Sequence, residues 1–417
     1  MIRNSFEDFS SDIFFFITGK EPSQKNQLIK RHTEHLHTQG DCSFPNTLKS
    51  WHEYVRKDGK SICGENVTLL KYIGKTTDDL IAASKQWHLK VTKIKEVKDR
   101  IHLFFDRSTA IQQGLTESVR NHDILKTRLC EKVSTVQTDP LCTQTDDLTS
   151  LRLQCLSTAI ENLNAVSNLT CSVMMTSKSS SSAPEGTRLV LAETVLNTKT
   201  GVKESIITAE EYNRLRHNEM TLIAQHKYGV RATADTKLKQ FIEHLGQSAV
   251  VFELLQIKPS SAIKINFDNA ASGSSKGAAF VLYNCARLET MIRTYNDKVK
   301  EGVYPPLPPF EEADFTLLNQ EEEWVLIYNY IMGLPEVLNL SVDHKGRSVE
   351  YRPHHICSFL SSMVRVFSQY YRKVRVLTEP RKHLLPVVFS RVHMLIILNQ
   401  TLKICLNILN IKSVTQM

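Results

Sequence analysis

A helical period of apolar residues runs through the segment FVLYNCARLETMIRTY, residues 280–295. At about 100° per residue, four apolar side chains fall within roughly 60° of one another on a helical wheel. These four are Val281, Cys285, Leu288 and Ile292. The narrow stripe predicts a helix that buries one face against its own domain.

Phe280, Tyr283 and Arg287 lie on another side of the same predicted helix, roughly 100° or more from the centre of the stripe. The helix does not need them for its own burial, so they are available for another role. An aromatic pair beside an arginine suits nucleic acid, because bases stack on aromatic rings and on guanidinium planes. A second packing surface, against later helices or a partner domain, would bury the same residues. The spacing alone leaves both hypotheses open.

The first 136 residues mix helical and extended patterns. Apolar residues recur at helical spacing around 76–100 and 111–133, whereas IHLFF at 101–105 is a short apolar run typical of a strand. No compact catalytic motif stands out in this part of the sequence. The patterns predict an α/β or α+β region.

The segment 187–215 alternates strand-like and turn-like residues. RLVLAETVL (188–196) and ESIIT (204–208) predict two strands around a turn at TKTG. Thr208 is a predicted N-cap for the helix that follows it. From about residue 237 onward the pattern predicts one helix after another.

Three polar or proline-rich stretches divide the chain. QTDPLCTQTDDLT (137–149) and TSKSSSSAPEG (176–186) lack apolar periodicity, which predicts a loop and a linker. VYPPLPPFEEAD (303–314) is expected to separate two helical groups, because proline removes the backbone donor that a helix interior needs. Domain boundaries near residues 145 and 180 follow.

Cysteine usage argues against both a disulfide framework and a structural zinc site. The nine cysteines are odd in number, widely scattered and never arranged as CxxC. His32, His35 and His37 form the one histidine cluster, and we expect them on a solvated surface helix rather than around a metal.

Hydropathy predicts no membrane span and no secretion signal. The longest apolar run, 387–399, is interrupted by Arg391 and His393 and is short for a bilayer core of about 30 Å. The apolar patch at 13–17 is too short for a signal peptide. We therefore expect a cytoplasmic protein that does not bind a membrane.

The net positive charge is concentrated at the end of the chain. Residues 351–417 hold ten Lys or Arg and one acidic residue, Glu379, so they carry all of the net charge of +8. A basic module on a neutral body favours a polyanionic partner, with nucleic acid ahead of a membrane surface. An incidental surface bias is the alternative.

Several motifs in this half of the chain occur together in a known domain. FVLYNCARL (280–288), EEEWVLIYNYIMGLPEVL (321–338), RPHHICSFLSSMVRVFSQYYRKVRVL (352–377) and the terminal segment 389–417 follow one another in the order and spacing of that domain. In this way the C-terminal part resembles the DALR anticodon-binding domain of arginyl-tRNA synthetases. Asn410 stands where the family has a glycine, a mild departure near the end of the chain. The resemblance implies a mainly α fold with a DALR-type helical bundle, preceded by a degenerate, shortened α/β synthetase-like region.

The resemblance also implies contacts with the anticodon loop. In the family these contacts come from five side chains, which correspond here to Phe280, Tyr283, Arg287, Tyr371 and Met417. Three cations that directly follow Tyr371 would attract phosphates without regard to base sequence. They are Arg372, Lys373 and Arg375.

The motifs of an aminoacylating enzyme are missing from the sequence. No His-Ile-Gly-His-like tetrad occurs, and the best positional candidate, 147–163, has no histidine or glycine at its start. Lys199 in NTKTG is the one match to the family's lysine loop, and a lysine in a turn is usually only solvated. No Gly-rich cofactor loop follows a strand. We therefore predict no catalytic residue, no metal and no cofactor.

A closer likeness is to the DALR anticodon-binding domain-containing proteins, through ITAEEYNRLRHNEM (207–220), VYPPLPPF (303–310) and the EPR-HL pattern at 379–385. This resemblance implies a noncatalytic tRNA-binding adaptor that recognises arginine tRNAs and presents them to a tRNA methyltransferase that forms N3-methylcytidine. A residual arginyl-tRNA synthetase and a protein-interaction scaffold are the alternatives. The predicted parts are a degenerate N-terminal region, a Ser-rich linker, a remnant of a catalytic region and the DALR domain: 1–175, 176–186, 187–236 and 237–417.

Overall fold

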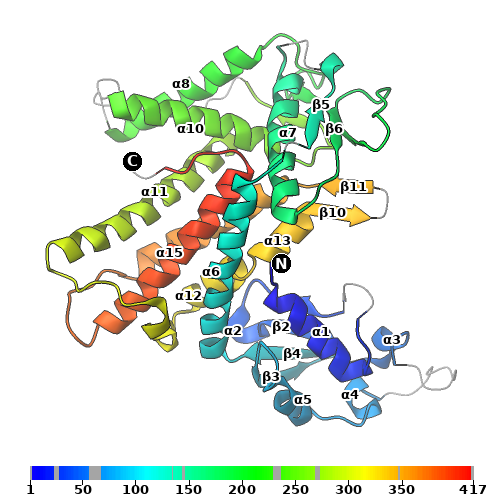
Figure 1. Cartoon of the computed structure of the whole chain (residues 1–417), viewed down its shortest axis with the longest axis vertical. Helices are drawn as coiled ribbons and strands as arrows, with labels where there is room; N and C mark the ends of the chain where they lie inside the picture. Colours follow the sequence, from blue (N-terminus) through cyan, green and yellow to red (C-terminus); the bar gives the residue numbers. More distant parts are fainter. Residues whose placement is uncertain are drawn as a thin grey trace. The chain divides into compact units, whose positions relative to one another are not determined.

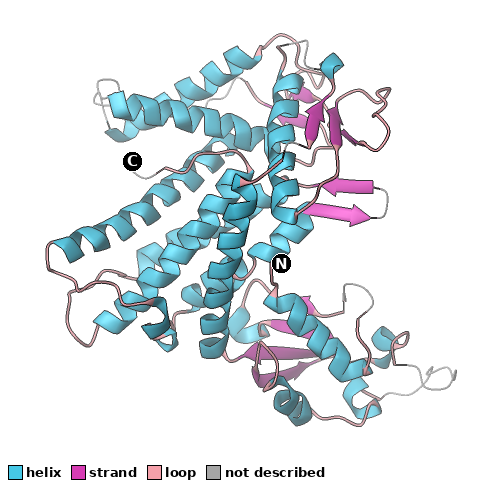
Figure 2. Cartoon of the chain, viewed as in Figure 1, coloured by secondary structure: helices cyan, strands magenta, loops and turns pink. Residues whose placement is uncertain are grey.

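The computed structural model describes residues 2–22, 28–55, 67–133, 135–142, 146–228, 236–267, 273–345 and 348–414. The fold is mostly helical with small sheets, which confirms the predicted fold class (Figures 1 and 2). The chain forms two compact units, each built from three separate segments. Unit 1 consists of Met1–Val119, Pro308–Gly333 and Arg381–Met394, and unit 2 consists of Arg120–Leu307, Leu334–Pro380 and Leu395–Met417.

Unit 1 is an antiparallel sheet with helices. The sheet has the strand order β1-β2-β4-β3, and all its pairings are antiparallel. Its elements up to residue 106 are α1 (Ser5–Thr18), β1 (Lys30–Arg31), α2 (Leu36–Gln39), β2 (Cys42–Pro45), α3 (Leu48–Trp51), α4 (Leu69–Tyr72), α5 (Thr77–Ser84), β3 (Val91–Val97) and β4 (Arg100–Phe105). Later segments add η2 (Phe310–Glu312), η3 (Phe315–Leu317), α12 (Glu321–Val325) and the π-helix η4 (Leu326–Ile331).

The core of unit 1 lies on the apolar face of β4. Ile101, Leu103 and Phe105 alternate toward the interior and are fully or almost fully buried. The ring of Phe105 packs edge-on against Phe9 of α1, with a centroid distance of 4.8 Å. This alternation confirms the strand predicted at 101–105.

Two sequence predictions in unit 1 are wrong. The helical pattern around 76–100 is a helix only over α5, because β3 pairs with β4 and presents its polar side chains to solvent. His32 is not on a solvated helix: its ring is buried and lies within hydrogen-bond distance of Gly40 O (3.0 Å) and Ser43 Oγ (2.9 Å). Burial lowers the pKa of His32. Among the described residues, no group of three or more His, Cys, Asp or Glu is placed to hold a metal.

Unit 2 contains the longer helices. Its elements up to residue 300 are β5 (Val136–Thr138), η1 (Pro140–Cys142), α7 (Leu148–Ser167), β6 (Val173–Thr176), β7 (Arg188–Leu191), β8 (Val195–Asn197), α8 (Ala209–Tyr228), α10 (Thr236–Leu255), β9 (Ile263–Ile265) and α11 (Gly273–Lys300). It continues with α13 (Leu334–Ser341), β10 (Val342–Lys345), β11 (Ser348–Tyr351) and α14 (His354–Lys373). Two helices contribute to both units: α6 (Arg107–Cys130) and α15 (Leu385–Ile408).

The Ser-rich stretch 176–186 lies inside one sheet rather than between two domains. It connects β6 to β7, which are parallel neighbours in the three-stranded sheet β5-β6-β7. Ser181 Oγ donates to the carboxylate of Asp139, at the end of β5, over 2.6 Å. The predicted linker is therefore a loop that is anchored to its own sheet.

The region 187–215 partly follows its prediction. Thr208 is the N-cap of α8: its Oγ1 accepts from Glu211 N, and the Glu211 carboxylate accepts from Thr208 N, which forms a capping box. ESIIT is not a strand, because Glu204 accepts backbone hydrogen bonds from Ile206 and Ile207 and folds the segment into a turn.

Helices α8 and α10 pack together through buried charges. Arg216 and Glu219 of α8 and Glu253 of α10 are each only 3% exposed. The Arg216 guanidinium donates to both carboxylates, and Tyr212 Oη also donates to Glu253. Apolar residues of α8 are divided between the two environments: Tyr212, Met220 and Ala224 are buried, whereas Leu215, Leu222 and Ile223 are exposed.

One glycine permits the close approach of these two helices. A Cβ at Gly246 of α10 would lie 2.9 Å from His217 Cα, which is closer than side-chain atoms pack. Glycine is therefore required by the distance between the two backbones rather than by an unusual φ.

Arg152 of α7 is fully buried, and among the described residues no carboxylate bonds to its guanidinium. Instead it donates to four backbone carbonyls, those of Glu193, Ile257, Lys258 and Ser261. Burial lowers its pKa to about 10, which leaves it charged at neutral pH. Glu193 lies in the loop between β7 and β8, and the other three acceptors lie in the loop between α10 and β9, so one side chain joins two loops.

Helix α15 is long and apolar enough to cross a membrane by composition alone. However, 61% of its most apolar window is buried inside the protein. Its cations also have protein partners, since Arg391 pairs with Glu323 and Lys403 pairs with Glu289. Burial and paired charges are the properties of a core helix.

Candidate RNA-binding site

Helix α11 has the orientation that its apolar stripe predicts. Val281, Cys285 and Leu288 are almost completely buried, and the helix packs against α10 and α14. On its other side Phe280 is 40% exposed, and Tyr283 and Arg287 are half-buried. Phe280 therefore stays exposed, whereas Tyr283 and Arg287 pack in part within the fold, and the role of the three residues stays a prediction.

Helix α14 brings the second group of predicted residues. Its buried face includes Ile356, Leu360, Val364 and Phe367, spaced three or four residues apart. Tyr371 comes after this stripe on the outer side and is 41% exposed. The helix ends at Lys373, after which the chain continues in an extended conformation.

The cations at this helix end also have a local role. Positive side chains in the last turn stabilise the exposed carbonyls and the dipole of a helix. Arg372 Nε, for example, donates to Ser368 O over 3.2 Å. The positive charge at this position is therefore compatible with helix stability as well as with ligand binding.

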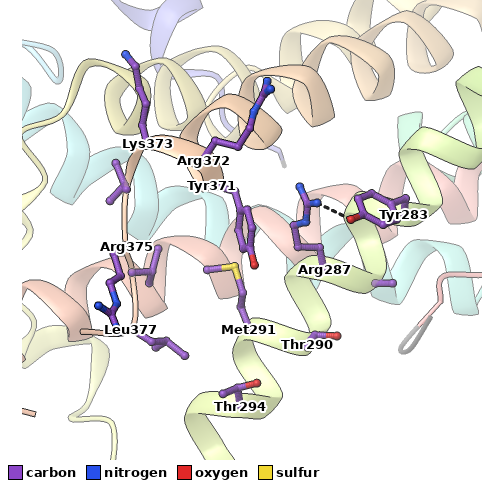
Figure 3. A pocket seen from close by; sticks show the side chains of 13 residues that line it. Tyr283, Arg287, Thr290, Met291, Thr294, Tyr371, Arg372, Lys373, Arg375 and Leu377 are labelled. Carbon is purple, nitrogen blue, oxygen red and sulfur yellow. Dashed lines mark hydrogen bonds between the residues drawn. The ribbon is translucent and has the colours of Figure 1, made fainter. Parts of the chain in front are cut away.

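Tyr283, Arg287 and Tyr371 form one stack between the two helices (Figure 3). The guanidinium carbon of Arg287 lies 4.5 Å from the ring centroid of Tyr283 and 4.3 Å from that of Tyr371. Arg287 Nη2 donates to Tyr283 Oη over 2.6 Å. Two cation–π contacts and a hydrogen bond hold the guanidinium between the rings.

A pocket of about 640 Å³ opens beside this stack. It is lined by Tyr283, Ala286, Arg287, Thr290, Met291, Thr294, Tyr371, Arg372, Lys373, Val374, Arg375, Val376 and Leu377. The lining combines an apolar wall, two threonine hydroxyls and four cations, and none of these lining residues is acidic. Tyr371 points between Arg287 on one side and Arg375 and Leu377 on the other (Figure 3). Such a pocket suits a flat aromatic ligand that carries negative charge.

Six of the eight predicted site residues meet at this pocket: Tyr283, Arg287, Tyr371, Arg372, Lys373 and Arg375. Phe280 is exposed on the same helix but does not line the pocket. Met417 lies outside the described residues. The role of these residues in RNA binding stays a prediction.

The sequence patterns did not predict the other residues that line the pocket. Thr290 and Thr294 follow Arg287 at i+3 and i+7, so extension of the same helical wheel would have found them. Val374, Val376 and Leu377 carry no comparable pattern, because they form the pocket wall only after the chain leaves α14.

In the region whose sequence resembles a synthetase catalytic region, two aspartates bond to neighbouring residues of the fold. Helix α7 begins after Asp147, whose carboxylate accepts from Ser150 N as an N-cap and pairs with Lys203 over 2.8 Å. At the end of β5, Asp139 accepts from Thr176 Oγ1 (2.9 Å), Ser181 Oγ (2.6 Å) and Leu141 N (3.0 Å). The hydrogen bond from Ser181 is the main cause that lowers the pKa of Asp139.

The fold is that of arginyl-tRNA synthetases. The structure matches Plasmodium falciparum arginyl-tRNA synthetase with a TM-score of 0.63 over 100% of both chains, and the Thermus thermophilus enzyme with a TM-score of 0.56 over 98% of this chain and 99% of that one. Both are 11% identical in sequence, so this likeness concerns the fold alone.

Within that fold, residues 281–417 match the family model of the DALR anticodon binding domain, which confirms the predicted resemblance. Two similar curated proteins are both called DALR anticodon-binding domain-containing protein 3. The one from Danio rerio is 34% identical over 51% of this chain and 39% of its own length, and the one from Rattus norvegicus is 32% identical over 47% and 37%. An arginine–tRNA ligase from Methanocella arvoryzae is 29% identical over 35% of this chain and 23% of its own length. The chain thus matches less than half the length of these relatives.

Proposed function

We propose that this protein is a noncatalytic, cytoplasmic tRNA-binding adaptor whose pocket between α11 and α14 receives the anticodon region of arginine tRNAs. The observation that carries the proposal is the convergence of six predicted residues, from segments about 85 residues apart, on one pocket inside a DALR anticodon-binding domain. Stacking on an exposed tyrosine contributes about 1–3 kcal/mol per base, and the cations supply attraction to phosphates.

The contacts at the carboxyl end of the parallel strands support the proposal that the protein does not aminoacylate tRNA. Ligands of α/β sheets bind outside the carboxyl ends of the strands. Here Asp139, at such an end, already accepts hydrogen bonds from Thr176 and Ser181 of its own sheet. The described residues at the start of α7 include no histidine.

Binding of full-length tRNAs tests the first part of the proposal. We expect arginine tRNAs to bind more tightly than other tRNAs, with an affinity that falls as salt rises. A filter-binding or gel-shift titration at several salt concentrations measures both properties. Equal and salt-insensitive binding of all tRNAs would contradict the proposal.

We further propose that the bound tRNA is presented to a separate methyltransferase that forms N3-methylcytidine. The support is the likeness to the DALR anticodon-binding domain-containing proteins, together with a pocket lined by two tyrosines and four cations. We expect this protein to increase N3-methylcytidine formation on arginine tRNAs by such a methyltransferase, measured by mass spectrometry of digested RNA. No increase, with tRNA binding intact, would leave a binding protein without this role.

A residual arginyl-tRNA synthetase is the second candidate, and the fold match favours it. Arginine-dependent exchange between ATP and pyrophosphate distinguishes the two candidates. We expect only background exchange, and exchange above background would favour the enzyme.

A further inference from the structure

The proline-rich segment 303–310 is not part of the pocket between α11 and α14. It runs from the end of α11 into η2 and contains four prolines in the sequence VYPPLPPF. None of its residues lines the pocket. The segment is therefore a separate feature of the surface.

The sequence itself holds this segment in the polyproline II conformation. Proline fixes its own φ at about −65°, and it keeps the residue before it out of the helical region. Each of the residues 304–309 is a proline or stands directly before one. The structure has no helix or strand over 305–309, and Pro309 has φ −50° and ψ 149°, which is the polyproline II region. Because these restraints are local, the segment has this conformation before any partner binds.

Burial along the segment repeats every three residues, which is the period of a polyproline II helix. One edge of the segment is packed and consists of buried and partly buried residues: Tyr304, Leu307 and Phe310. A second edge is exposed at every position: Val303, Pro306 and Pro309. An apolar edge thus stays in solvent although the other edge is packed.

Tyr304 anchors the segment to unit 2. Its hydroxyl donates to the carbonyl of Thr378, and its ring lies against that of Tyr295, with a centroid distance of 5.4 Å. Tyr295 Oη in turn donates to the carbonyl of Pro305 over 3.0 Å. Within the described part of the chain, no donor bonds to the carbonyl of Pro306. The packed edge is therefore held in place, while the ring and the carbonyl of Pro306 can contact a partner.

We propose that residues 303–309 are a docking motif for a second protein that has an aromatic-lined groove with a basic rim. Such grooves bind PxxP segments, and a segment that is already in the polyproline II conformation loses little entropy on binding. The PxxP pattern occurs twice here, in the pairs Pro305 with Pro308 and Pro306 with Pro309. This interaction goes beyond the proposed tRNA binding and does not depend on it.

The charges beside the motif define the rim of the groove. Glu311 and Glu312 directly follow the prolines, and both are exposed. Lysines or arginines next to a partner's groove would complement these two carboxylates and speed association. The same carboxylates would repel phosphates, so RNA is disfavoured at this segment. A protein is therefore the occupant that the segment fits.

Purified proline-recognition domains test the proposal on the full chain. The probes are individual WW and SH3 domains, including ones with a basic rim, and isothermal titration calorimetry measures Kd. We expect a domain with a basic rim to bind, and the double variant Pro306→Ala/Pro309→Ala to bind it roughly tenfold more weakly. Pro184→Ala, at an exposed proline in the loop between β6 and β7, is the matched control and should retain the wild-type Kd.

A charge variant tests the rim. Glu311→Gln/Glu312→Gln should weaken binding of the same domain by about threefold at low salt, and by less at high salt. An unchanged Kd at low salt would overturn the basic rim. Thermal unfolding of each variant checks that the fold is intact, and Pro306→Ala alone replaces the double variant if the latter is destabilised.

The outcomes separate this inference from the proposed function. If no domain binds the wild-type protein, the docking motif is overturned and the prolines are only a rigid spacer. Equal Kd values for the wild type and the proline variants would overturn it as well. Neither result changes the binding of tRNA, which the titrations of arginine tRNAs measure separately.

Discussion

Helices α8 and α11 differ in the side chains that they bury against neighbouring helices. Helix α11 buries apolar residues such as Val281 and Leu288 and leaves an arginine and aromatic rings on its outer side. Helix α8 buries Arg216 and Glu219 against α10 and exposes leucines. A helical wheel of apolar positions therefore identifies the exposed side of α11 but does not reveal that α8 buries charged side chains. Where charges pair inside the fold, the apolar side of a helix is not evidence of burial.

The largest expected effect comes from the charge network of α8. Glu253→Gln removes one carboxylate from Arg216 and leaves a buried cation incompletely paired. We expect a loss of about 3–5 kcal/mol in the free energy of unfolding, measured by urea denaturation. Glu243→Gln, at an exposed position of the same helix, is the control and should stay within about 0.5 kcal/mol. Equal effects would show that the buried pair is not a main contact of α8.

Leucines on the two helices should respond differently to truncation. Leu288→Ala in α11 removes a buried side chain, and we expect a loss of about 2–5 kcal/mol. Leu222→Ala on the outer side of α8 should change stability by no more than about 0.5 kcal/mol, because its side chain is already 51% exposed. Thermal and urea unfolding of the two variants measure the difference. A large loss for Leu222→Ala would mean that the outer side of α8 is covered in solution.

Two glycines test the distance between helices. Gly246→Ala should cost about 1–3 kcal/mol, because its Cβ would meet the backbone of His217 on α8. Gly277→Ala in α11 is the matched variant: the nearest atom is Phe252 Cε1 at 3.6 Å, an ordinary contact. Since alanine favours a helix by up to about 1 kcal/mol over glycine, Gly277→Ala should be neutral or stabilising. Equal melting temperatures for both variants would contradict the close packing of α8 on α10.

The outer sides of the two helices should differ in RNA binding rather than in stability. Tyr371→Ala opens the stack beside α11 and should weaken tRNA binding by about 1–3 kcal/mol with little change in unfolding. Leu222→Ala should leave tRNA affinity unchanged. Filter binding at constant salt measures both variants. Wild-type affinity for Tyr371→Ala would remove this residue from the proposed site.

Local patterns predicted the parts of the fold in which a single helix or strand determines its own burial. They identified α11 and its outer face, the strand at 101–105 and the cap at Thr208, because spacing along the chain decides each of these. They failed for β3, whose Lys93 and Lys95 face solvent at the edge of a sheet, since only pairing with β4 makes the segment extended.

The residues of the candidate site were likewise predicted only in part. Tyr283 and Arg287 follow from helical position and from family resemblance, and Tyr371 follows from the resemblance alone. The wall formed by Val374, Val376 and Leu377 depends on how the chain leaves α14. The contact of Ser181 with Asp139 joins residues 42 positions apart, a distance over which sequence periodicity carries no information.

Arg152 couples local motions that would otherwise be independent. Because one guanidinium holds carbonyls from two loops, the opening of either loop exposes a desolvated cation and releases its hold on the other. Residues near Glu193, Lys258 and Ser261 should consequently exchange their amide protons at a common rate, as one cooperative opening unit. The hydrogen bonds of this one buried cation would then determine how long the loops around Arg152 stay closed.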